Sequence, residues 1–272
     1  MDLKHAISLK SIQNARELGG YITADGRRIK NGVLLRTASL SLISDDDICM
    51  LTDTYHLQHI IDFRMEAELP GAEDPVIDGV KHHHLDVIDM AASGLEEYAR
   101  SGISKPDVMQ IVRLSVESGL MNENMYIGFL ANDGGKKAFS EFFRILLKAA
   151  PDRSVLWHCT SGKDRTGLAA MLLLSALGVE EDVIMEDYLL TNEYYAEQIE
   201  GMKLLLQSKG CDDACIDQAI LVFDAVDERF MQNAIHYLKK EYGSVIGYIH
   251  NALLISQEDI HILKAKYLEP LF

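Results

Sequence analysis

The most informative part of this sequence is one continuous stretch, which reads Val155-Leu156-Trp157-His158-Cys159-Thr160-Ser161-Gly162-Lys163-Asp164-Arg165-Thr166-Gly167. Residues 154–157 end in three large apolar side chains and predict a short buried strand, and an apolar helix is expected from about 165 to 177. Between them lies a seven-residue turn, 159–165. Backbone N–H groups of such a turn converge at the helix N-terminus, where the helix dipole adds partial positive charge. The stretch therefore predicts a binding site for a tetrahedral oxyanion.

A cysteine and an arginine at the two ends of this turn add chemistry to the predicted anion site. Arg165, six residues after Cys159, is placed to fold back and make bidentate hydrogen bonds to two oxygens of the anion. A thiol with an ordinary pKa of about 8.5 ionises more easily beside amides and a guanidinium, and the thiolate is the nucleophilic form. Thr166 is expected to hydrogen-bond the sulfur, and His158 is expected to orient the turn by bonding to backbone. These residue types favour in-line attack on phosphorus.

The composition excludes several classes of protein. The chain has 272 residues, of which 48% are hydrophobic and 25% are charged, as in ordinary globular proteins, and its formal net charge is −16. A chain this acidic is unsuited to non-specific nucleic-acid binding and is repelled by anionic membrane surfaces. An anionic substrate must therefore be held by local donors that act against the overall field.

The sequence shows neither a membrane span nor a secretory signal. No uncharged apolar run reaches the ~18–20 residues that a span needs, and the first 20 residues are polar. The four cysteines, which are Cys49, Cys159, Cys211 and Cys215, do not make a disulfide framework in a chain of this length. We expect a reduced, cytoplasmic protein without stable membrane insertion, and export without a recognisable signal stays open.

Strands alternate with helices before the central stretch. Asp25-Gly26 predicts a tight turn between strands at 21–23 and 27–29, in an N-terminal hairpin region of about 1–45. Ser44 followed by Asp47 is typical of a helix start, because a side-chain oxygen there can accept from an unpaired amide. The other elements expected in this half are a helix at 45–54, strands at 59–63 and 80–87, and a helix at 138–150.

The chain after Gly178 is predicted to be almost entirely helical, with helices at 181–208, at 212–241 with interruptions, at 244–252 and at 257–268. Residues 90–134 are less regular. They contain a helix-like stretch, 106–119, and could form a lid over a pocket. Strands that alternate with helices and are followed by a helical tail indicate an α/β fold with a helical C-terminal layer at about 180–272. We expect a single domain over 1–272.

Several motifs together resemble a known family. H-C-x5-R-T between a strand and a helix resembles the phosphate loop of cysteine-dependent phosphatases. Its form here, H-C-x-x-G-K-D-R-T, resembles that of bacterial atypical tyrosine and dual-specificity phosphatases, some of which also hydrolyse phosphoinositides. Three further segments resemble that branch in the expected order, namely Asn14-Ala15-Arg16-Glu17-Leu18-Gly19-Gly20-Tyr21, Leu35-Arg36-Thr37-Ala38, and Ile61-Asp62-Phe63-Arg64 with Glu66. The resemblance implies a cysteine-phosphatase-like fold, with a small central sheet flanked by helices.

The same resemblance implies hydrolysis of phosphomonoesters, with phosphotyrosine first and phosphoserine, phosphothreonine or phosphoinositides as further substrates. Cys159 would attack the ester to give a thiophosphoryl-cysteine, an acid would protonate the leaving oxygen, and water would then release phosphate. No metal or cofactor is expected, because amides and Arg165 supply the transition-state electrostatics. The substrate phosphate, or a phosphate ion, is expected to bind the turn residues Thr160, Ser161, Gly162, Lys163, Asp164 and Arg165.

Three aspartates are candidates for the general acid. Many relatives use the aspartate of a Trp-Pro-Asp loop, but the one tryptophan of this chain, Trp157, belongs to the predicted strand. Asp164 is the position that the bacterial branch offers, although a carboxylate there repels phosphate unless it is protonated or turned toward the leaving group. Asp86 and Asp89, at the end of the predicted strand 80–87, are the alternatives.

Lys163 has two interpretations. It is either a second cation beside the phosphate, which would favour polyanionic headgroups, or a solvated lysine paired with a nearby carboxylate. Four further charged residues are expected to brace the loop through hydrogen bonds rather than to be surface charges, namely Asp62, Arg64, Arg16 and Arg36.

Other clusters have structural interpretations. His82-His83-His84 cannot all ligate one metal, since neighbouring strand residues alternate faces. Cys211 and Cys215 lie on a predicted helix with no partnering pair, which indicates unused thiols. The tyrosines of the acidic helical stretch are expected to pack rather than to be phosphorylated, namely Tyr188, Tyr194 and Tyr195.

Two functions from other classes stay open beside a phosphatase. One is a phospho-binding module with an inactive loop, which the presence of Cys159, Arg165 and Thr166 together opposes. The other is a sulfurtransferase, which shares a cysteine-headed loop but has no need of an Arg-Thr pair suited to phosphate.

Overall fold

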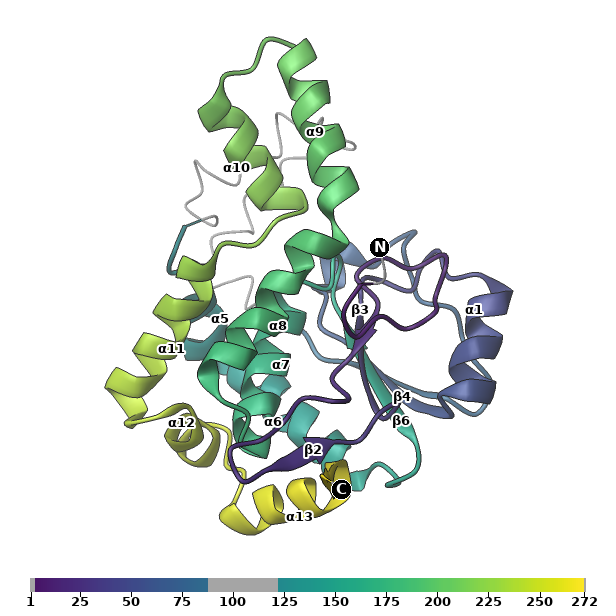
Figure 1. Cartoon of the computed structure of the whole chain (residues 1–272), viewed down its shortest axis with the longest axis vertical. Coiled ribbons are helices and arrows are strands. Elements are labelled where there is room, and N and C mark those ends of the chain that lie inside the picture. Colours follow the sequence, from purple (N-terminus) through teal and green to yellow (C-terminus); the bar gives the residue numbers. More distant parts are fainter. Residues whose placement is uncertain (1–2, 88–121, 272) are drawn as a thin grey trace.

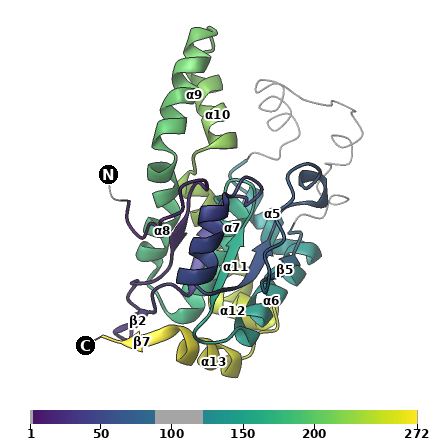
Figure 2. The same cartoon turned by 90° about the vertical axis from the view of Figure 1, so that its right-hand side faces the viewer.

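The computed structural model describes residues 3–87 and 122–271. The predicted helix at 106–119, most of the segment 90–134 and Asp89 therefore lie outside the described residues. Figure 1 and Figure 2 show a strand core with helices on both sides, and two helices, α9 and α10, that project away from it.

The central sheet has five strands within the described residues, in the spatial order β1-β3-β6-β4-β5. Their bounds are Arg16–Glu17 (β1), Leu34–Thr37 (β3), Ser154–His158 (β6), Leu57–Asp62 (β4) and Lys81–His84 (β5). The last four run parallel, and β1 pairs antiparallel with β3. The carboxyl ends of the parallel strands meet at one edge of the sheet, which is the edge where ligands bind in open α/β sheets.

Successive side chains along the central strands point to opposite faces of the sheet, and each face packs against its own apolar cluster. On β6, Val155 and Trp157 pack in a large cluster with the apolar residues of α6 (Asp133–Lys148) and α7 (Asp164–Leu177). Leu156 points the other way, into a smaller cluster with Leu51. Because β6 is buried on both faces, it is a continuous apolar run rather than an alternating one.

The small cluster is covered by α1 (Asp45–Cys49) and the π-helical turn Met50–Thr54 that continues it. Ser44 begins this helix as expected, since its hydroxyl accepts from the amide of Asp47 at 3.3 Å. In Figure 1, α1 lies on one side of the sheet, while α6, α7 and α8 lie on the other.

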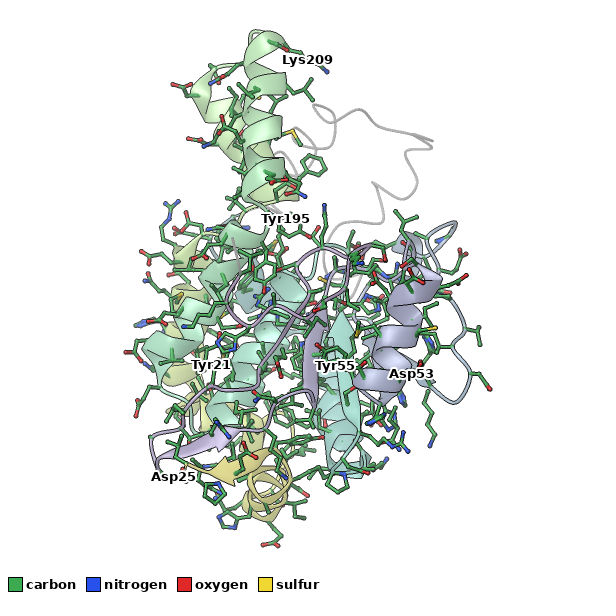
Figure 3. All side chains as sticks on the ribbon, turned by 45° about the vertical axis from the view of Figure 1, so that its right-hand side comes forward. Tyr21, Asp25, Asp53, Tyr55, Tyr195 and Lys209 are labelled. Atoms are coloured by element: carbon green, nitrogen blue, oxygen red, sulfur yellow. The ribbon has the colours of Figure 1, made fainter. Side chains whose placement is uncertain are left out.

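The C-terminal part is helical, as predicted, and continues the larger core. Its helices are α8 (Glu181–Tyr194), α9 (Ala196–Ser208), α10 (Asp213–Phe223), α11 (Glu228–Tyr242), α12 (Val245–Asn251) and α13 (Gln257–Tyr267), and α5 (Met125–Ala131) packs against them from earlier in the chain. Helices α9 and α10 form a hairpin with an apolar cluster of its own, built around Leu206 and Ile220. Figure 3 places Tyr195 at the base of this hairpin and Lys209 near its tip.

Two predictions about the chain termini need correction. The tight turn at Asp25-Gly26 forms, with the Gly26 amide donating to the Thr23 carbonyl at 2.9 Å, but residues 21–23 do not form a strand and make only two isolated bridges, from Ile22 to Arg28 and from Thr23 to Val179. Instead β2 (Arg27–Ile29) pairs with β7 (Leu268–Pro270), which continues directly from α13 where the helix was expected to reach 268. Because Arg28 and its partner Glu269 are 241 positions apart, no local sequence pattern predicts that these two strands pair.

None of the described helices is long and apolar enough to cross a membrane.

Candidate active site

The turn predicted to bind an anion lies at the carboxyl edge of the sheet, between β6 and α7. Cys159 begins it and is 1% exposed. Gly162 has φ +65°, and a Cβ at this position would lie 2.2 Å from the carbonyl oxygen of Thr37 on the neighbouring strand. Glycine is therefore required both by the backbone conformation and by the close approach of β3.

The carbonyls of residues 160–163 each accept a hydrogen bond from outside the anion position, and the Cys159 carbonyl lies beside a ring nitrogen of His158. Asn14 Nδ2 donates to the carbonyls of Ser161 and Gly162 at 3.1 and 3.0 Å. Four other contacts complete the set, namely the Thr160 carbonyl with the Ser39 amide (3.0 Å), the Ser161 carbonyl with the Tyr195 hydroxyl (2.8 Å), the Lys163 carbonyl with the Gly167 amide (2.9 Å), and the Cys159 carbonyl with His158 Nδ1 (3.1 Å).

The amides of the same turn are unused. Within the described residues, the backbone N–H groups of residues 160–165 donate to no carbonyl and no side chain. Amides that are available at the N-terminus of a 14-residue helix are the arrangement that favours an anion, as the sequence predicts for this turn.

Arg165 is held beside the turn by a carboxylate that the sequence reasoning missed. Glu68, in the 3₁₀ turn Glu66–Glu68, accepts from Nη1 and Nη2 of Arg165 at 2.6 and 3.0 Å, and from the hydroxyl of Thr160. Burial alone would raise the pKa of Glu68, but the ion pair with Arg165 outweighs it and lowers this pKa to about 2. Glu66, named above in the motif, is exposed and does not make this contact.

One edge of the Arg165 guanidinium has no hydrogen-bond partner among the described residues. A guanidinium has five N–H groups. On Arg165, Glu68 uses two of them and the carbonyl of Phe63 a third, at 3.2 Å from Nη1. The Nε–H and the second Nη2–H remain without a partner among the described residues. These two groups lie on one edge of the plane and form the fork that binds two oxygens of a phosphate.

Asp164, the first residue of α7, has one carboxylate oxygen in a hydrogen bond. The hydroxyl of Tyr126, on α5, donates to Oδ1 at 2.6 Å, and the hydroxyl of Tyr188 lies 2.9 Å from that of Tyr126. Burial is the main cause that raises the pKa of both tyrosines, so both are neutral donors. The Oδ2 atom accepts no hydrogen bond from the described residues and lies 3.9 Å from the Lys163 ammonium.

Lys163 fits neither interpretation made from the sequence. Its side chain is 4% exposed, and its ammonium donates to the carbonyls of Leu221, Val222 and Ala225, at 2.6, 3.0 and 3.1 Å. These carbonyls lie at the C-terminal end of α10, where a cation is favoured by the helix dipole. Lys163 is therefore neither a free second cation nor a solvated surface residue.

Arg16 and Arg36 are buried rather than surface charges, and both contact Asp187 on α8. Arg16 Nε lies 3.2 Å from Oδ1, and Arg36 Nη1 lies 2.5 Å from Oδ2. Arg36 Nη2 also donates to the Gly162 carbonyl at 3.0 Å, and Arg16 donates to the side-chain oxygen of Asn14. Arg36 therefore contacts the turn directly and Arg16 contacts it through Asn14, as expected of residues that brace the loop.

Asp62 and Arg64 form a second buried group on the other side of the turn. Arg64 contacts both oxygens of Asp62 and also Asp74, at 3.0 Å from Nη2 to Oδ1. Asp74 Oδ2 lies 2.8 Å from Nε2 of His158, whose other ring nitrogen faces the Cys159 carbonyl. His158 thus contacts backbone as expected, and Asp74 is a partner that sequence reasoning missed.

The ligand atoms of Asp62, Asp74 and His158 lie within 4.8 Å of one another, a spacing that could suit a metal ion. The Nη2 atom of Arg64 donates to both carboxylates, so the guanidinium supplies the positive charge in this cluster. The side chains of the adjacent histidines have different partners. Nε2 of His83 lies 2.9 Å from Nδ1 of His59 on β4, and Nε2 of His84 lies 2.8 Å from the Arg64 carbonyl.

One expectation about an individual residue is not met. The hydroxyl of Thr166 is buried and has no hydrogen-bond partner among the described residues, so the expected bond to the cysteine sulfur is not formed. Tyr188 and Tyr195 are buried, as expected of packing residues, and their hydroxyls also hydrogen-bond Tyr126 and the Ser161 carbonyl. Asp86 follows β5 and lines a separate cavity of about 780 Å³ rather than the turn.

A cavity of about 550 Å³ opens beside the turn, on the side of Thr160 and Glu68. Its remaining lining comes from the N-terminal segment and the segment after β3, which include Ser11 and Ser39, and from Arg64 and Ala72 after β4. Thr160 is therefore the turn residue that borders this hollow of the surface.

Comparison with known proteins agrees with this geometry. Residues 7–269 match the model of the tyrosine phosphatase family. A protein of Cupriavidus necator, whose name gives a provisional assignment as a tyrosine-protein phosphatase, is 30% identical over 97% of this chain and 89% of its own. The triple specificity protein phosphatase PtpB of Mycobacterium tuberculosis is 25% identical over 88% of this chain and 91% of its own.

A tyrosine-protein phosphatase of Nostoc commune matches a shorter part, with 29% identity over 38% of this chain. The family model extends over both the sheet and the helical C-terminal part, so the match is not confined to the loop motif. The chain therefore belongs to the tyrosine phosphatase family, with the α/β fold expected of it.

Proposed function

We propose that this enzyme hydrolyses phosphotyrosine through a thiophosphoryl intermediate on Cys159. The observation that carries the proposal is the turn itself, in which the carbonyls of residues 160–163 are occupied and the amides are unused within the described residues. Three non-bridging phosphate oxygens would accept from these amides, and the free fork of Arg165 would bind two of them. Phosphorus would then lie above the sulfur of Cys159.

In the first step the sulfur of Cys159 forms a bond to phosphorus as the bond to the ester oxygen breaks. The leaving oxygen takes a proton from Asp164 through Oδ2, the oxygen that Tyr126 leaves unoccupied. In the second step the carboxylate of Asp164 accepts a proton from water, the water oxygen bonds to phosphorus, and the sulfur departs as thiolate. Asp164 is favoured over Asp86 because it belongs to the turn itself, whereas Asp86 follows β5.

The substrate range is part of the proposal. One relative is named a triple specificity phosphatase, which supports activity on more than one class of phosphoester. Lys163 is engaged with α10, so it offers no second cation for a polyanionic headgroup. We therefore place phosphotyrosine first, and phosphoseryl peptides and soluble phosphoinositides are the comparison substrates in the test.

The test compares wild type with Cys159→Ser. Release of phosphate from an aryl phosphate and from a phosphotyrosyl peptide should be lost in the variant, while phosphate binding is retained. Turnover unchanged in Cys159→Ser would overturn the proposal. Turnover of thiosulfate by wild type without turnover of any phosphoester would favour sulfur transfer, and binding of phosphopeptide without turnover would favour a binding module.

The variant Asp164→Asn tests whether Asp164 is the general acid. A general acid matters most when the leaving group is a poor one, because a good leaving group departs without a proton. The variant should therefore slow hydrolysis of an alkyl-like ester by roughly 10²-fold or more and of an activated aryl ester much less. Equal slowing of both esters would contradict the assignment to Asp164.

A further inference from the structure

A group of three charged side chains lies buried behind the phosphate-binding turn. Arg16 and Arg36, from β1 and β3, are both 0% exposed, and Asp187 from α8 is 1% exposed. We call these three residues the buried charge network. The carboxylate contacts one arginine through each of its oxygens, at 3.2 and 2.5 Å.

The network carries an unbalanced positive charge. Burial and the neighbouring Arg16 lower the pKa of Arg36 to about 10, which still leaves it protonated at neutral pH. Burial would raise the pKa of Asp187, but Arg16 and Arg36 outweigh this effect and lower it, so the carboxylate is ionised. Tyr21 donates to Asp187 as a neutral hydroxyl. Two cations and one anion leave a net charge of +1.

The other arginines near the turn are compensated by carboxylates. Arg165 is paired with Glu68. Arg64 is paired with Asp62 and Asp74. The other titratable groups around the network are His5 and four tyrosines, besides the partly exposed Lys4 and Glu17. The tyrosines are Tyr21, Tyr188, Tyr194 and Tyr195. The net positive charge of the network is therefore not balanced by a neighbouring carboxylate, and it lies in a buried region of low dielectric constant where it is weakly screened.

The network contacts the turn at two points. Arg36 Nη2 donates to the Gly162 carbonyl, and Arg16 donates to Asn14, whose side chain holds the carbonyls of Ser161 and Gly162. Asn14 has φ +54°, a conformation that is uncommon for residues other than glycine, so the surrounding contacts must stabilise it. Holding these carbonyls outward turns the adjoining amides inward.

We propose that the buried charge network positions the phosphate-binding turn and also makes the electrostatic potential there more positive. This potential favours the Cys159 thiolate and a bound phosphate dianion. The inference rests on the proposed function, because it concerns the same thiolate and the same anion. It assigns to Arg16, Arg36 and Asp187 an electrostatic role in addition to a structural one.

Two variants separate the electrostatic role from a merely structural one. Arg36→Gln and Asp187→Asn break the same 2.5 Å ion pair, but the first lowers the net charge of the network to 0 and the second raises it to +2. A structural defect alone would impair the turn in the same direction in both variants. An electrostatic role moves the properties of the turn in opposite directions.

The measurement is alkylation of Cys159 by iodoacetamide, followed on the Cys159 peptide by mass spectrometry because the chain has three other cysteines. The pH midpoint of alkylation should rise by about one unit in Arg36→Gln and fall in Asp187→Asn, the size of effect that one buried charge has on a neighbouring group. Protection by inorganic phosphate should need about tenfold more phosphate in Arg36→Gln, and less in Asp187→Asn, than in wild type.

A conservative variant keeps the test decisive if Asp187→Asn does not fold, as judged by its circular dichroism. Arg36→Lys retains the charge, so its midpoint and phosphate protection should stay near those of wild type while those of Arg36→Gln shift. Shifts of equal size and sign in the lysine and glutamine variants would overturn the inference. An ordinary alkylation midpoint in wild type would instead overturn the proposed function, so the two failures are distinguishable.

Discussion

Replacing Glu68 by glutamine tests how the guanidinium of Arg165 is held. The ion pair lowers the pKa of Glu68 to about 2, from 4.5 for a free glutamate. A group whose pKa is lower in the folded state stabilises that state above its unfolded pKa and loses this effect as pH falls through its folded pKa. From these two pKa values the stabilisation at pH 7 is about 3 kcal/mol.

Glu68→Gln should therefore lower the free energy of unfolding in urea by about 3 kcal/mol at pH 7. The difference from wild type should narrow to about 2 kcal/mol at pH 3.5, because the carboxylate is then mostly protonated in the unfolded state while it stays ionised in the folded state. The matched control is Glu66→Gln, a substitution of the same kind at an exposed position of the same turn, which should leave the unfolding free energy within about 0.5 kcal/mol of wild type.

The same variant has a consequence for activity. Once Glu68 no longer fixes two of its nitrogens, Arg165 must be ordered by the substrate, at a cost of about 0.5–1.5 kcal/mol. The value of kcat/KM on an aryl phosphate should then fall by roughly 2- to 10-fold. A kcat/KM equal to or above that of wild type would refute this reasoning, since it would mean that Glu68 competes with phosphate for the guanidinium instead of orienting it.

Three further substitutions follow from the geometry of the turn. Tyr126→Phe removes the donor to Asp164 Oδ1, so hydrolysis of an ester with a poor leaving group should slow by about 10-fold relative to an activated ester, and equal slowing would contradict the positioning role. Lys163→Met leaves three carbonyls at the end of α10 without their donor, so amide hydrogen exchange in α10 should accelerate, and unchanged exchange there would count against the contact. Gly162→Ala puts a Cβ 2.2 Å from the Thr37 carbonyl, so phosphate should no longer protect Cys159 from alkylation, and full protection would show that the turn tolerates the methyl group.

The strand, turn and helix start at 154–177 could be predicted from sequence because they are contiguous. Cys159 and Arg165 lie six residues apart, and local rules of helix termini are enough to place them around one point. The helical C-terminal part could also be predicted, since apolar periodicity along a helix is a local pattern. The break between α8 and α9 at Tyr195 could not, because neither glycine nor proline marks it.

The residues that hold the turn come from distant parts of the chain and carry no local signal. Asp187 lies on a helix with many acidic residues, and nothing in its sequence context separates it from the exposed ones. Glu68 contacts Arg165 across 97 positions, and Tyr126 contacts Asp164 across 38. Lys163 shows the same limit, since its true partners are the carbonyls of a helix end almost 60 residues away. Side-chain contacts that depend on tertiary packing need the fold before they can be identified.

The central claim is that one sulfur forms the covalent intermediate, and rapid quenching of the wild-type enzyme during turnover of an aryl phosphate tests it most directly. Mass spectrometry of the quenched protein should find a phosphoryl group on the peptide that contains Cys159, appearing at the rate at which the first equivalent of phenol is released. Full turnover with no phosphoryl group on Cys159, or with the group on another residue, would contradict the account.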